Sequence, residues 1–389
     1  MSDSNLLLDP LPPGWENHKF GDICNRVKDS YKPIEGGDTP YVGLEHLAQG
    51  FPVFVGRGKE SDVKSAKTAF KVDDILFGKL RPYLRKGARA NFDGVCSTDI
   101  LAFRATPSCE SEYLKFVIHS NEFIDHAKST TSGVQHPRTS WPSLKEFRLS
   151  LPPLAEQKKM AHILSTVQKA IEAQERIIQT TTELKKALMH KLFTEGLRNE
   201  PQKQTEIGPV PESWEVKRFD SFAVLQRGFD ITKKDQRPGE YPVVSSGGVS
   251  SYHDEPKVKG PGVVIGRKGT LGTVHYIPTD YWPHDTTLWV KDFKGNDPRF
   301  VGYLLKTMRL KRFDTGAANP TLNRNIVHGE KIVVPPKGQQ VEIGEALETV
   351  ESKITFHESR KHSFQDLFLT LLHELMTAKS RVHRLEISL

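Results

Sequence analysis

Cysteine is scarce in this sequence, and so are long apolar runs. The three cysteines, Cys24, Cys96 and Cys109, form no C-x-x-C pair and are an odd number. They indicate neither a disulfide framework nor a zinc site, and a reducing compartment fits them best. No apolar stretch approaches the ~20 residues that span a bilayer, and Met1 to Pro13 lacks the basic flank and apolar core of a signal peptide. We expect a soluble protein of the cytoplasm.

Sequence motifs of catalysis are also missing. Pro152-Pro153 and Pro335-Pro336 are similar to part of the Asn-Pro-Pro-aromatic loop of amino-methyltransferases, but the required asparagine and aromatic ring are absent around both pairs. The segment from Gly266 to Gly272 departs from the phosphate-binding G-x-x-x-x-G-K-[ST] pattern and precedes a strand-like sequence rather than a helix. No H-E-x-x-H metal motif and no G-x-S-x-G elbow occurs. The sequence therefore predicts no catalytic residue, no cofactor-binding residue and no metal ligand in this chain.

The charge balance is mildly basic. Lys and Arg total 55 against 48 Asp and Glu, which gives a net charge of +7 and a pI near 9.1. Such an excess is compatible with a polyanionic partner, although it is also common in unrelated proteins. The charge alone therefore leaves the nature of the partner open.

The second half of the sequence repeats the first. Three residues near the start have counterparts near the middle: Trp15, Glu16 and Phe20 match Trp214, Glu215 and Phe219. The segment 151–157, LPPLAEQ, recurs as 334–340, VPPKGQQ, and the offset of 183 residues continues without a gap into the following sequence. A repeat of this length indicates duplicated domains. Two similar domains with different interiors are suited to reading separate parts of one extended partner.

Each repeat begins with a strand-rich domain. In the first, short apolar runs at 75–77 and 100–103 are separated by Gly, Pro, Asp and Asn, and a helix is predicted over 110–127. The second keeps this order, with strand-like runs at 263–265 and 286–290 and a helix at 299–313. The expected fold class is α+β, with two mixed α/β domains in tandem. The expected boundaries are 1–150 for the first domain, 151–196 for a long helix, 197–211 for a linker, 212–333 for the second domain, 334–380 for a second long helix and 381–389 for a tail.

A long helix follows each Pro-Pro pair. Its residues recur at alternating steps of four and three, which is the heptad pattern of a coiled coil. For one isolated segment, an amphipathic helix packed on its own domain is the simpler interpretation. Two equal copies favour an antiparallel intramolecular coiled coil with pseudo-two-fold symmetry, a rod about 60 Å long at ~1.5 Å per residue that would separate the two domains. The predicted seam consists of Ile163, Val167, Ile177, Leu184 and Leu188 in the first helix and of Val350, Ile354, Phe364, Leu367 and Leu371 in the second.

Basic and polar loops occupy matching positions in both domains. The basic stretch after Gly78 matches the stretch after Gly266, and a second loop at 131–138 matches 314–321. Arg, Lys, Gln and Asn side chains contact phosphates, guanine and adenine in nucleic acids. Each residue taken singly is as well explained as a solvated surface group, but the paired placement favours a nucleic-acid surface. The candidate DNA-binding residues are Lys79, Arg81, Arg85, Lys86, Arg89, Gln135, His136 and Arg138 in the first domain and Arg227, Arg267, Lys268, Asn319, Asn323 and Arg324 in the second.

The doubled order of motifs resembles the specificity subunit of type I restriction-modification enzymes. The resemblance rests on a P-x-x-W-E opening before a phenylalanine, a strand-rich domain, a Gly-x-x-x-Pro loop and a Pro-Pro pair followed by a glutamine and a long helix, all present twice. The segments 151–157 and 207–216 carry much of it. One departure is Lys337-Gly338-Gln339, which stands where the family usually has Leu-x-Glu and puts the contacts at the start of that helix in doubt.

That resemblance implies a non-catalytic, sequence-specific DNA-binding protein. Each globular part would be a target recognition domain that reads one half of a bipartite, asymmetric site on double-stranded DNA, and the coiled coil would fix the gap between the halves. Two methylation subunits carrying S-adenosylmethionine would dock on the helices, and restriction subunits using ATP and magnesium would join them. The complex would methylate adenine or cleave DNA, as in defence against phage.

Two other functions stay open at the level of sequence. A stand-alone nuclease or methyltransferase would need a catalytic loop and a cofactor motif, which the sequence lacks. A coiled-coil adaptor whose globular ends bind proteins would bind DNA weakly and without the steep salt dependence of phosphate contacts. The paired basic loops favour the DNA-binding function over both.

Overall fold

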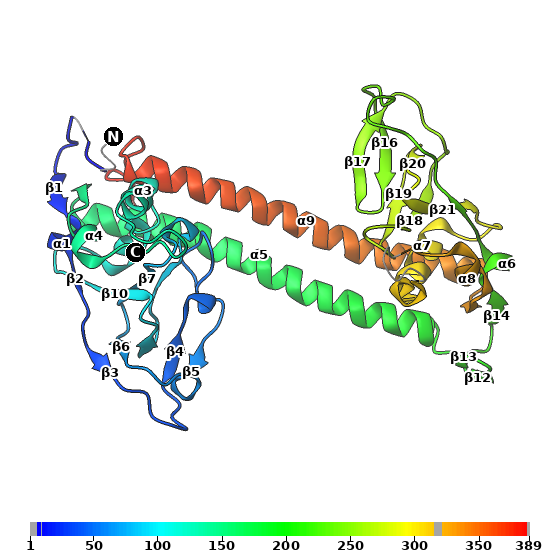
Figure 1. Cartoon of the computed structure of the whole chain (residues 1–389), viewed down its shortest axis with the longest axis horizontal. Coiled ribbons are helices and arrows are strands. Elements are labelled where there is room, and N and C mark those ends of the chain that lie inside the picture. The colour runs from blue at the N-terminus through cyan, green and yellow to red at the C-terminus, as the bar shows by residue number, and fades with distance from the viewer. Residues whose placement is uncertain (1–5, 9, 315–320, 387–389) are drawn as a thin grey trace. The chain divides into compact units, whose positions relative to one another are not determined.

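The computed structural model describes residues 6–8, 10–314 and 321–386, and the chain divides into two compact units. Unit 1 contains Met1–Gln174 and Arg360–Leu389, and unit 2 contains Glu175–Ser359. Each unit combines one strand-rich domain with part of each of two long helices (Figure 1). No helix in the described ranges is long and apolar enough to cross a membrane.

The two long helices predicted from the sequence are present. Helix α5 spans Leu154–Thr194, and α9 spans Lys337–Met376. In unit 1 the N-terminal half of α5 packs against the C-terminal half of α9, and in unit 2 the other two halves meet. The pairing is therefore antiparallel within each unit, as expected of this fold class. Gly196, with a φ of +71°, follows α5 in the left-handed conformation that glycine adopts at helix ends.

The seam of this helix pair differs in phase from the predicted one. Most of the predicted seam residues are partly buried, but Leu184 and Leu367 are 57% and 43% exposed. The prediction was wrong for these two. The neighbouring positions Lys185 and Phe368 face inward instead.

Lys185 explains why the phase was misjudged. Its ammonium group lies 2.8 Å from a carboxylate oxygen of Glu351, and only 17% of its side chain is exposed. An inward position occupied by a lysine in an ion pair leaves no apolar signal in the sequence, so the heptad pattern points to the adjacent Leu184 instead. Many of the buried apolar positions of the two helices still recur at heptad steps, among them Met160, Leu164, Ile171, Leu192, Ile343, Leu347, Phe368, Leu372 and Leu375. Ala161, Phe193 and Met376 are buried beside them.

The described residues of unit 1 form three sheets. A four-stranded sheet has the order β2-β10-β7-β8, with β2 at Cys24–Arg26, β7 at Ile75–Gly78, β8 at Gly87–Arg89 and β10 at Ile100–Ala105. A five-stranded sheet has the order β3-β6-β9-β4-β5, with β3 at Ser30–Tyr31, β4 at Pro40–Val42, β5 at Gly58–Lys59, β6 at Lys67–Phe70 and β9 at Gly94–Cys96. The third sheet pairs β1 (Glu16–Lys19) with β11 (Arg148–Leu151).

In unit 2, the residues outside 315–320 form four sheets. The four-stranded one has the order β15-β21-β18-β19, with β15 at Val224–Arg227, β18 at Gly262–Gly266, β19 at Val274–Ile277 and β21 at Thr287–Asp292. A three-stranded sheet orders β17 (Gly248–His253), β16 (Tyr241–Ser245) and β20 (Trp282–Pro283). Two further pairs are β14 (Glu215–Arg218) with β22 (Lys331–Val334) and β12 (Gln202–Thr205) with β13 (Gly208–Pro211), the second being a hairpin in a segment expected to be a plain linker.

The sequence repeat is also a repeat of topology. The two four-stranded sheets have equivalent strand orders and antiparallel neighbours throughout. The two-stranded sheets that flank the long helices correspond as well, since Glu16 pairs with Leu151 and Glu215 with Val334. After β11 the chain passes through Pro152-Pro153 into α5, and after β22 it passes through Pro335-Pro336 into α9. The fold therefore contains two copies of one domain, each leading directly into the long helix that follows it.

The short helices are more broken than the sequence predicted. The single helix expected at 110–127 is two helices, because the Ser120 hydroxyl accepts a hydrogen bond from the Phe123 amide and caps the second. The helix expected at 299–313 ends early, since Arg309 adopts a φ of +50°. The helices are α1 (Phe20–Ile23), α2 (Ser111–Val117), α3 (Asn121–Ser129), α4 (Trp141–Leu144), α6 (Phe219–Phe222), α7 (Pro298–Thr307) and α8 (Arg324–Gly329), with 3-10 turns η1 (Leu44–His46), η2 (Glu60–Asp62), η3 (Pro82–Leu84) and η4 (Leu310–Phe313).

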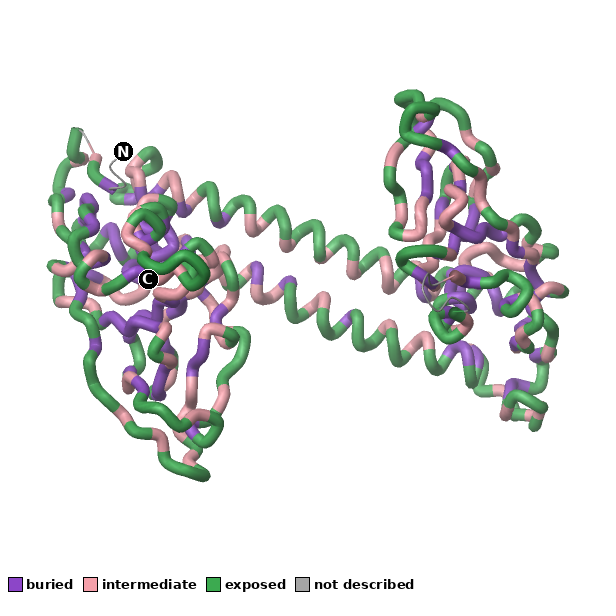
Figure 2. The backbone as a smooth tube through the Cα atoms, in the orientation of Figure 1, coloured by how far each residue is buried: buried purple, intermediate pink, exposed green. Residues whose placement is uncertain are grey.

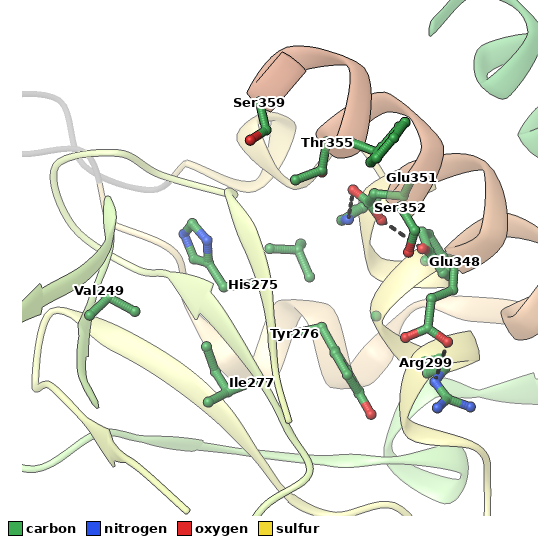
Figure 3. A pocket seen from close by; sticks show the side chains of 15 residues that line it. Val249, His275, Tyr276, Ile277, Arg299, Glu348, Glu351, Ser352, Thr355 and Ser359 are labelled. Carbon is green, nitrogen blue, oxygen red and sulfur yellow. Dashed lines mark hydrogen bonds and ion pairs between the residues drawn. The ribbon is translucent and has the colours of Figure 1, made fainter. Parts of the chain in front are cut away.

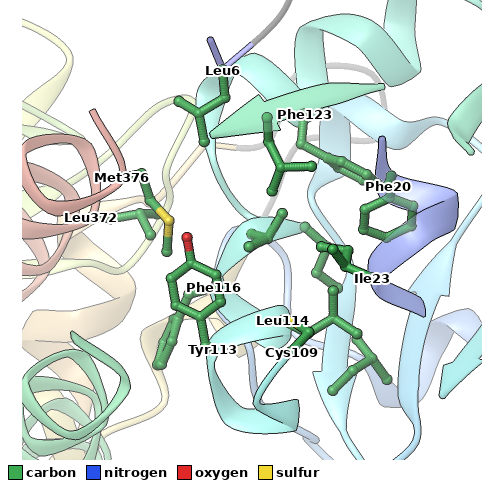
Figure 4. Close-up of a cluster of buried hydrophobic side chains, with 14 of the residues drawn as sticks. Leu6, Phe20, Ile23, Cys109, Tyr113, Leu114, Phe116, Phe123, Leu372 and Met376 are labelled. Atoms are coloured by element: carbon green, nitrogen blue, oxygen red, sulfur yellow. The ribbon is translucent and has the colours of Figure 1, made fainter. Parts of the chain in front are cut away.

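Each unit has its own hydrophobic core, and the long helices contribute to both (Figure 2). In unit 1, Figure 4 shows Leu372 and Met376 of α9 beside Tyr113 and Phe116 of α2. The rings of Phe116 and Phe368 have centroids 5.9 Å apart. Burial of such large apolar side chains contributes roughly 1.5–3 kcal/mol each. The helices are thus part of the folding unit rather than an appended stalk.

Candidate nucleic-acid interface

In unit 1 two loops with candidate DNA-binding residues lie side by side. Leu80 and Arg138 form an antiparallel β-bridge, and the Arg81 amide donates to the Pro137 carbonyl at 2.8 Å. The Thr139 amide donates to the Lys79 carbonyl at 3.1 Å. These bonds join the stretch after β7 to the loop between α3 and α4. We call residues 79–85 and 131–138 the first platform.

Unit 2 builds the same arrangement from the corresponding residues. Lys268 and Thr321 form an antiparallel β-bridge, and the Leu322 amide donates to the Arg267 carbonyl at 3.0 Å. Thr321 is the position equivalent to Arg138 at the offset of 183 residues. We call residues 267–272 and 321–324 the second platform. Asn319, the candidate adenine reader of this loop, lies outside the described residues.

Several candidate cations hold the fold together. The Arg85 guanidinium donates to the His119 carbonyl at 3.1 Å and to the Asn121 side-chain oxygen at 2.6 Å, and the Lys86 ammonium donates to the Leu44 carbonyl. Arg89 forms ion pairs at 2.5 Å with Asp73 and at 3.2 Å with Glu112. These side chains brace the first platform and the helices behind it. Sequence reasoning could not separate them from cations that face solvent.

Two aspartates contact the platforms, Asp99 through its carboxylate and Asp285 through its backbone carbonyl. Asp99 accepts two hydrogen bonds from Arg138, and these bonds lower the pKa of the Asp99 carboxyl. In unit 2, Asp285 forms an ion pair with Arg227 at 3.0 Å, and its backbone carbonyl accepts from Arg267 at 3.5 Å. Neither aspartate was predicted, because each lies far in sequence from the loops that it holds.

Most of the remaining candidates face solvent on the platforms. Lys79 is half-buried, and among the described residues neither its side chain nor that of Arg81 has a hydrogen-bond or ion-pair partner. Gln135 and His136 are exposed at the tip of the loop, as are Lys268 and Arg324 in unit 2. The Asn323 side chain accepts from the Asn325 amide and so caps α8. The arrangement offers cations and amide groups on a fixed base, which suits contacts to phosphates and base edges.

The doubled tryptophan and glutamine motifs fasten each domain to its long helix. The Trp15 indole donates to Glu156 at 3.0 Å, and the Trp214 indole donates to Gln339 at 2.9 Å. Gln339 is the residue where the sequence departs from the expected Leu-x-Glu, yet it keeps the contact. The next residue repeats too: Gln157 accepts from the Glu110 amide at 2.8 Å, and Gln340 accepts from the Asp297 amide at 3.0 Å.

Glu156 is almost fully buried, and a cation from the C-terminal segment neutralises it. The Arg381 guanidinium donates to both oxygens of Glu156, at 2.8 and 3.0 Å, and lies over the Trp15 ring. Burial raises the pKa of Glu156, but these hydrogen bonds outweigh it and lower the pKa below its usual value. The neutral Gln339 of the second repeat needs no such cation.

A carboxylate of α9 ties the second domain to both long helices. Glu351 accepts hydrogen bonds from Lys185 of α5 at 2.8 Å and from the Tyr303 hydroxyl of α7 at 2.6 Å, with Lys306 at 3.3 Å. Burial raises the pKa of Glu351, but the hydrogen bonds from Lys185 and Tyr303 lower it to about 2.

Glu351 lies at the edge of a cavity of about 750 Å³ between α7, α9 and β19 (Figure 3). Figure 3 shows His275 and Ile277 on its strand side and Thr355 on its helix side. In the described part of the chain, no group of three or more His, Cys, Asp or Glu residues has a metal-binding arrangement.

Comparison with known proteins places these features in a family. A sequence model of the type I restriction modification DNA specificity domain matches residues 12–182 and 211–363. The putative type I restriction enzyme MjaX specificity subunit of Methanocaldococcus jannaschii is 24% identical over 409 residues, which cover 96% of each chain. The MjaVIII specificity subunit of the same organism is 23% identical over 425 residues, covering 96% of this chain and 95% of the relative.

A solved structure supports the same fold. The S subunit of a type I restriction-modification system from M. genitalium superposes with a TM-score of 0.68 at 15% identity, covering 96% of this chain and 99% of that one. The duplicated domains and paired long helices are thus shared with a protein of very different sequence. The chain therefore belongs to the type I restriction-modification specificity subunit family, whose members are generally non-catalytic and recognise DNA sequence within a larger complex.

Proposed function

We propose that this chain reads a bipartite, asymmetric site on double-stranded DNA, with one half-site for each repeat. The recognition domains would span 1–150 and 212–333, and the helices at 151–196 and 334–380, with the linker at 197–211 and the tail at 381–389, would set the gap between the half-sites. The observation that carries this proposal is that both repeats build the same two-loop platform but place different side chains on it. Two different half-sites require a backbone arrangement that repeats and side chains that differ between the repeats.

On each platform the solvent-facing candidates would make the contacts. Lys79 and Arg81 of the first platform and Lys268 and Arg324 of the second would bind phosphates or guanine, and Gln135 would pair with adenine. The braced residues Arg85, Lys86, Arg89, Arg138, Arg227 and Arg267 would then support the surface more than touch the bases. Asn319 and Asn323 are retained as candidates at the end of the second loop, as is His136 in the first.

The chemistry of the complex would belong to partner subunits. Two methylation subunits, which carry S-adenosylmethionine, would dock on α5 and α9, and restriction subunits using ATP and magnesium would join them. Large apolar side chains on the helices support such a surface: Leu184, Phe356, Leu367 and Leu369 are 57%, 56%, 43% and 47% exposed. A single exposed apolar residue is ordinary, but large exposed apolar side chains on both helices are groups that a docking protein could bury.

Methylome sequencing tests the proposal directly. The full chain is expressed with the methylation subunit of its own system, and the methylated motif is compared with that of two double variants, Lys79→Ala with Arg81→Ala and Lys268→Ala with Arg324→Ala. We expect each double variant to relax or lose one half-site while the bases of the other stay unchanged. A variant that weakens both half-sites equally, or a complex that binds DNA without salt dependence, contradicts the two-reader proposal and favours a protein adaptor.

A further inference from the structure

Val134 at the tip of the first platform is the most exposed large apolar side chain recorded in the described residues, with an exposure of 101%. The next values in unit 1 are 64% for Val55 and 61% for Ile34. A lone exposed valine is not unusual in itself. Val134 differs from the others in its position. It lies between Gln135 and Gly133, whose backbone is left-handed, on a loop whose base is hydrogen-bonded to the rest of the domain.

The base of that loop is closed by backbone and side-chain bonds. The amides of Ser132 and Arg138 each donate to the other's carbonyl, at 2.9 and 3.0 Å, and the Arg138 guanidinium is fixed by Asp99. Gly133 has a φ of +90°, and a Cβ there would meet the His136 carbonyl at 3.2 Å. Five residues therefore turn tightly on a fixed base and carry Val134 outward.

The surroundings of Val134 are polar and cationic. Gln135 and His136 follow it and are exposed, and Lys79 and Arg81 come from the adjoining segment of the platform. A protein-binding hot spot would need an apolar or aromatic cluster. Tyr83 is 51% exposed on the other segment of the platform, and within 133–137 Val134 is the one large apolar side chain recorded as exposed among the described residues. A basic rim around one methyl-bearing side chain fits the major groove of DNA, where the apolar group of an unmodified base pair is the C5 methyl of thymine.

We propose that Val134 is a specificity-determining residue that contacts a thymine methyl group in the half-site read by the first repeat. This inference rests on the proposed function, since it assigns a base contact to the first platform. With Gln135 beside it as an adenine reader, the tip would select an A·T pair or two neighbouring A·T pairs.

Deoxyuridine, which lacks only the methyl group of thymidine, provides the test. The complex of the full chain with its methylation subunit is bound to duplexes of its own motif in which each thymine in turn is replaced by deoxyuridine. We expect about fourfold weaker binding at one thymine of the first half-site, which corresponds to ~0.8 kcal/mol for one buried CH₂-sized group. Val134→Ser should bind the two duplexes equally and resemble the wild type on deoxyuridine.

Val55→Ser is the matched control, because Val55 is exposed in the same unit but lies outside the platform. It should keep the full discrimination between thymine and deoxyuridine. The inference is overturned if no replacement of thymine by deoxyuridine weakens wild-type binding, or if the half-site affected by variants of the first platform contains no A·T pair. It is also overturned if Val134→Ser distinguishes thymine from deoxyuridine as well as the wild type does. If the proposed function itself is wrong, the result is different: the complex binds all duplexes with similar affinity, whether they carry thymine or deoxyuridine.

Discussion

Asp99 holds Arg138 through two hydrogen bonds, from Nε to Oδ1 at 2.8 Å and from Nη2 to Oδ2 at 3.2 Å. The backbone carbonyl of the same aspartate accepts from the Lys79 amide at 2.9 Å. One residue thus fixes both segments of the first platform. Lys79 and Arg138 lie more than fifty residues apart in the sequence, so the relative position of the two segments depends on this contact and on the bridge beside it.

Asp99→Asn should loosen the first platform and leave the second unaffected. An asparagine keeps one acceptor but loses the charge that holds the guanidinium in place. We expect about tenfold weaker binding to the cognate duplex, the equivalent of one charge-assisted hydrogen bond, measured by titration at constant salt. Asp93→Asn is the control, because the Asp93 carboxylate bonds Lys71 and the Val72 amide away from the platform. Equal affinities of the Asp99 variant and the wild type would contradict the bracing role.

Glu351→Gln should destabilise the attachment of the second domain to the helices. The glutamine would leave Lys185 without its carboxylate and weaken the bond from Tyr303, at a cost of about 1–2 kcal/mol in the free energy of unfolding. Urea unfolding followed by circular dichroism measures this. Glu348→Gln serves as comparison, since the Glu348 carboxylate pairs at 2.8 Å with Arg299, whose side chain is 36% exposed against 17% for Lys185, and exposed pairs contribute little. Similar losses in the two variants would show that Glu351 is not the specific tie.

The stability of unit 1 should fall in mild acid because of His119. This imidazole is buried, and burial lowers its pKa to about 4 despite a hydrogen bond with the Gly87 carbonyl. The unfolded chain binds a proton below about pH 6.5, whereas the folded chain does not until pH 4. Stability that is complete above pH 6.5 is therefore lost as the pH falls toward 4, by about 1 kcal/mol per pH unit. His119→Gln should show a shallower loss between pH 6.5 and 4.5 in urea unfolding, and parallel curves for the two proteins would refute the assignment.

Arg381 and Glu156 should behave as a coupled pair. Arg381→Met leaves a buried carboxylate without its cation, so we expect a loss of about 3 kcal/mol in the free energy of unfolding. The double variant with Glu156→Gln should recover most of that loss, because it recreates the neutral contact that Gln339 makes with Trp214 in the second repeat. A double-mutant cycle measures the coupling. Additive losses in the double variant would mean that the ion pair is not what the C-terminal segment supplies.

The sequence predicted the duplication and the long helices because both leave local patterns. The offset of 183 residues joins Pro152 to Pro335, and heptad steps mark α5 and α9. The same patterns failed at Leu184, where the inward position belongs to Lys185, and at 118–120, where a serine cap divides a helix. Asp99 and Asp285 were not predicted as contacts of the platform loops, because such residues are recognised only by their tertiary partners. Local sequence patterns thus predict the helices and strands. Contacts between residues far apart in the sequence decide which of the cationic side chains face solvent.

The central claim is that two unlike recognition domains read two half-sites whose gap the helices set, and an insertion in α5 tests it most directly. Helix α5 runs without a break from Leu154 to Thr194, and four residues inserted after Gln174 lengthen it by about 6 Å, as a stutter that a coiled coil accommodates. That length equals about two base pairs at ~3.4 Å each. Methylome sequencing should then show both half-site sequences unchanged and the gap between them altered by one or two base pairs. Altered half-site bases with an unchanged gap would contradict the account.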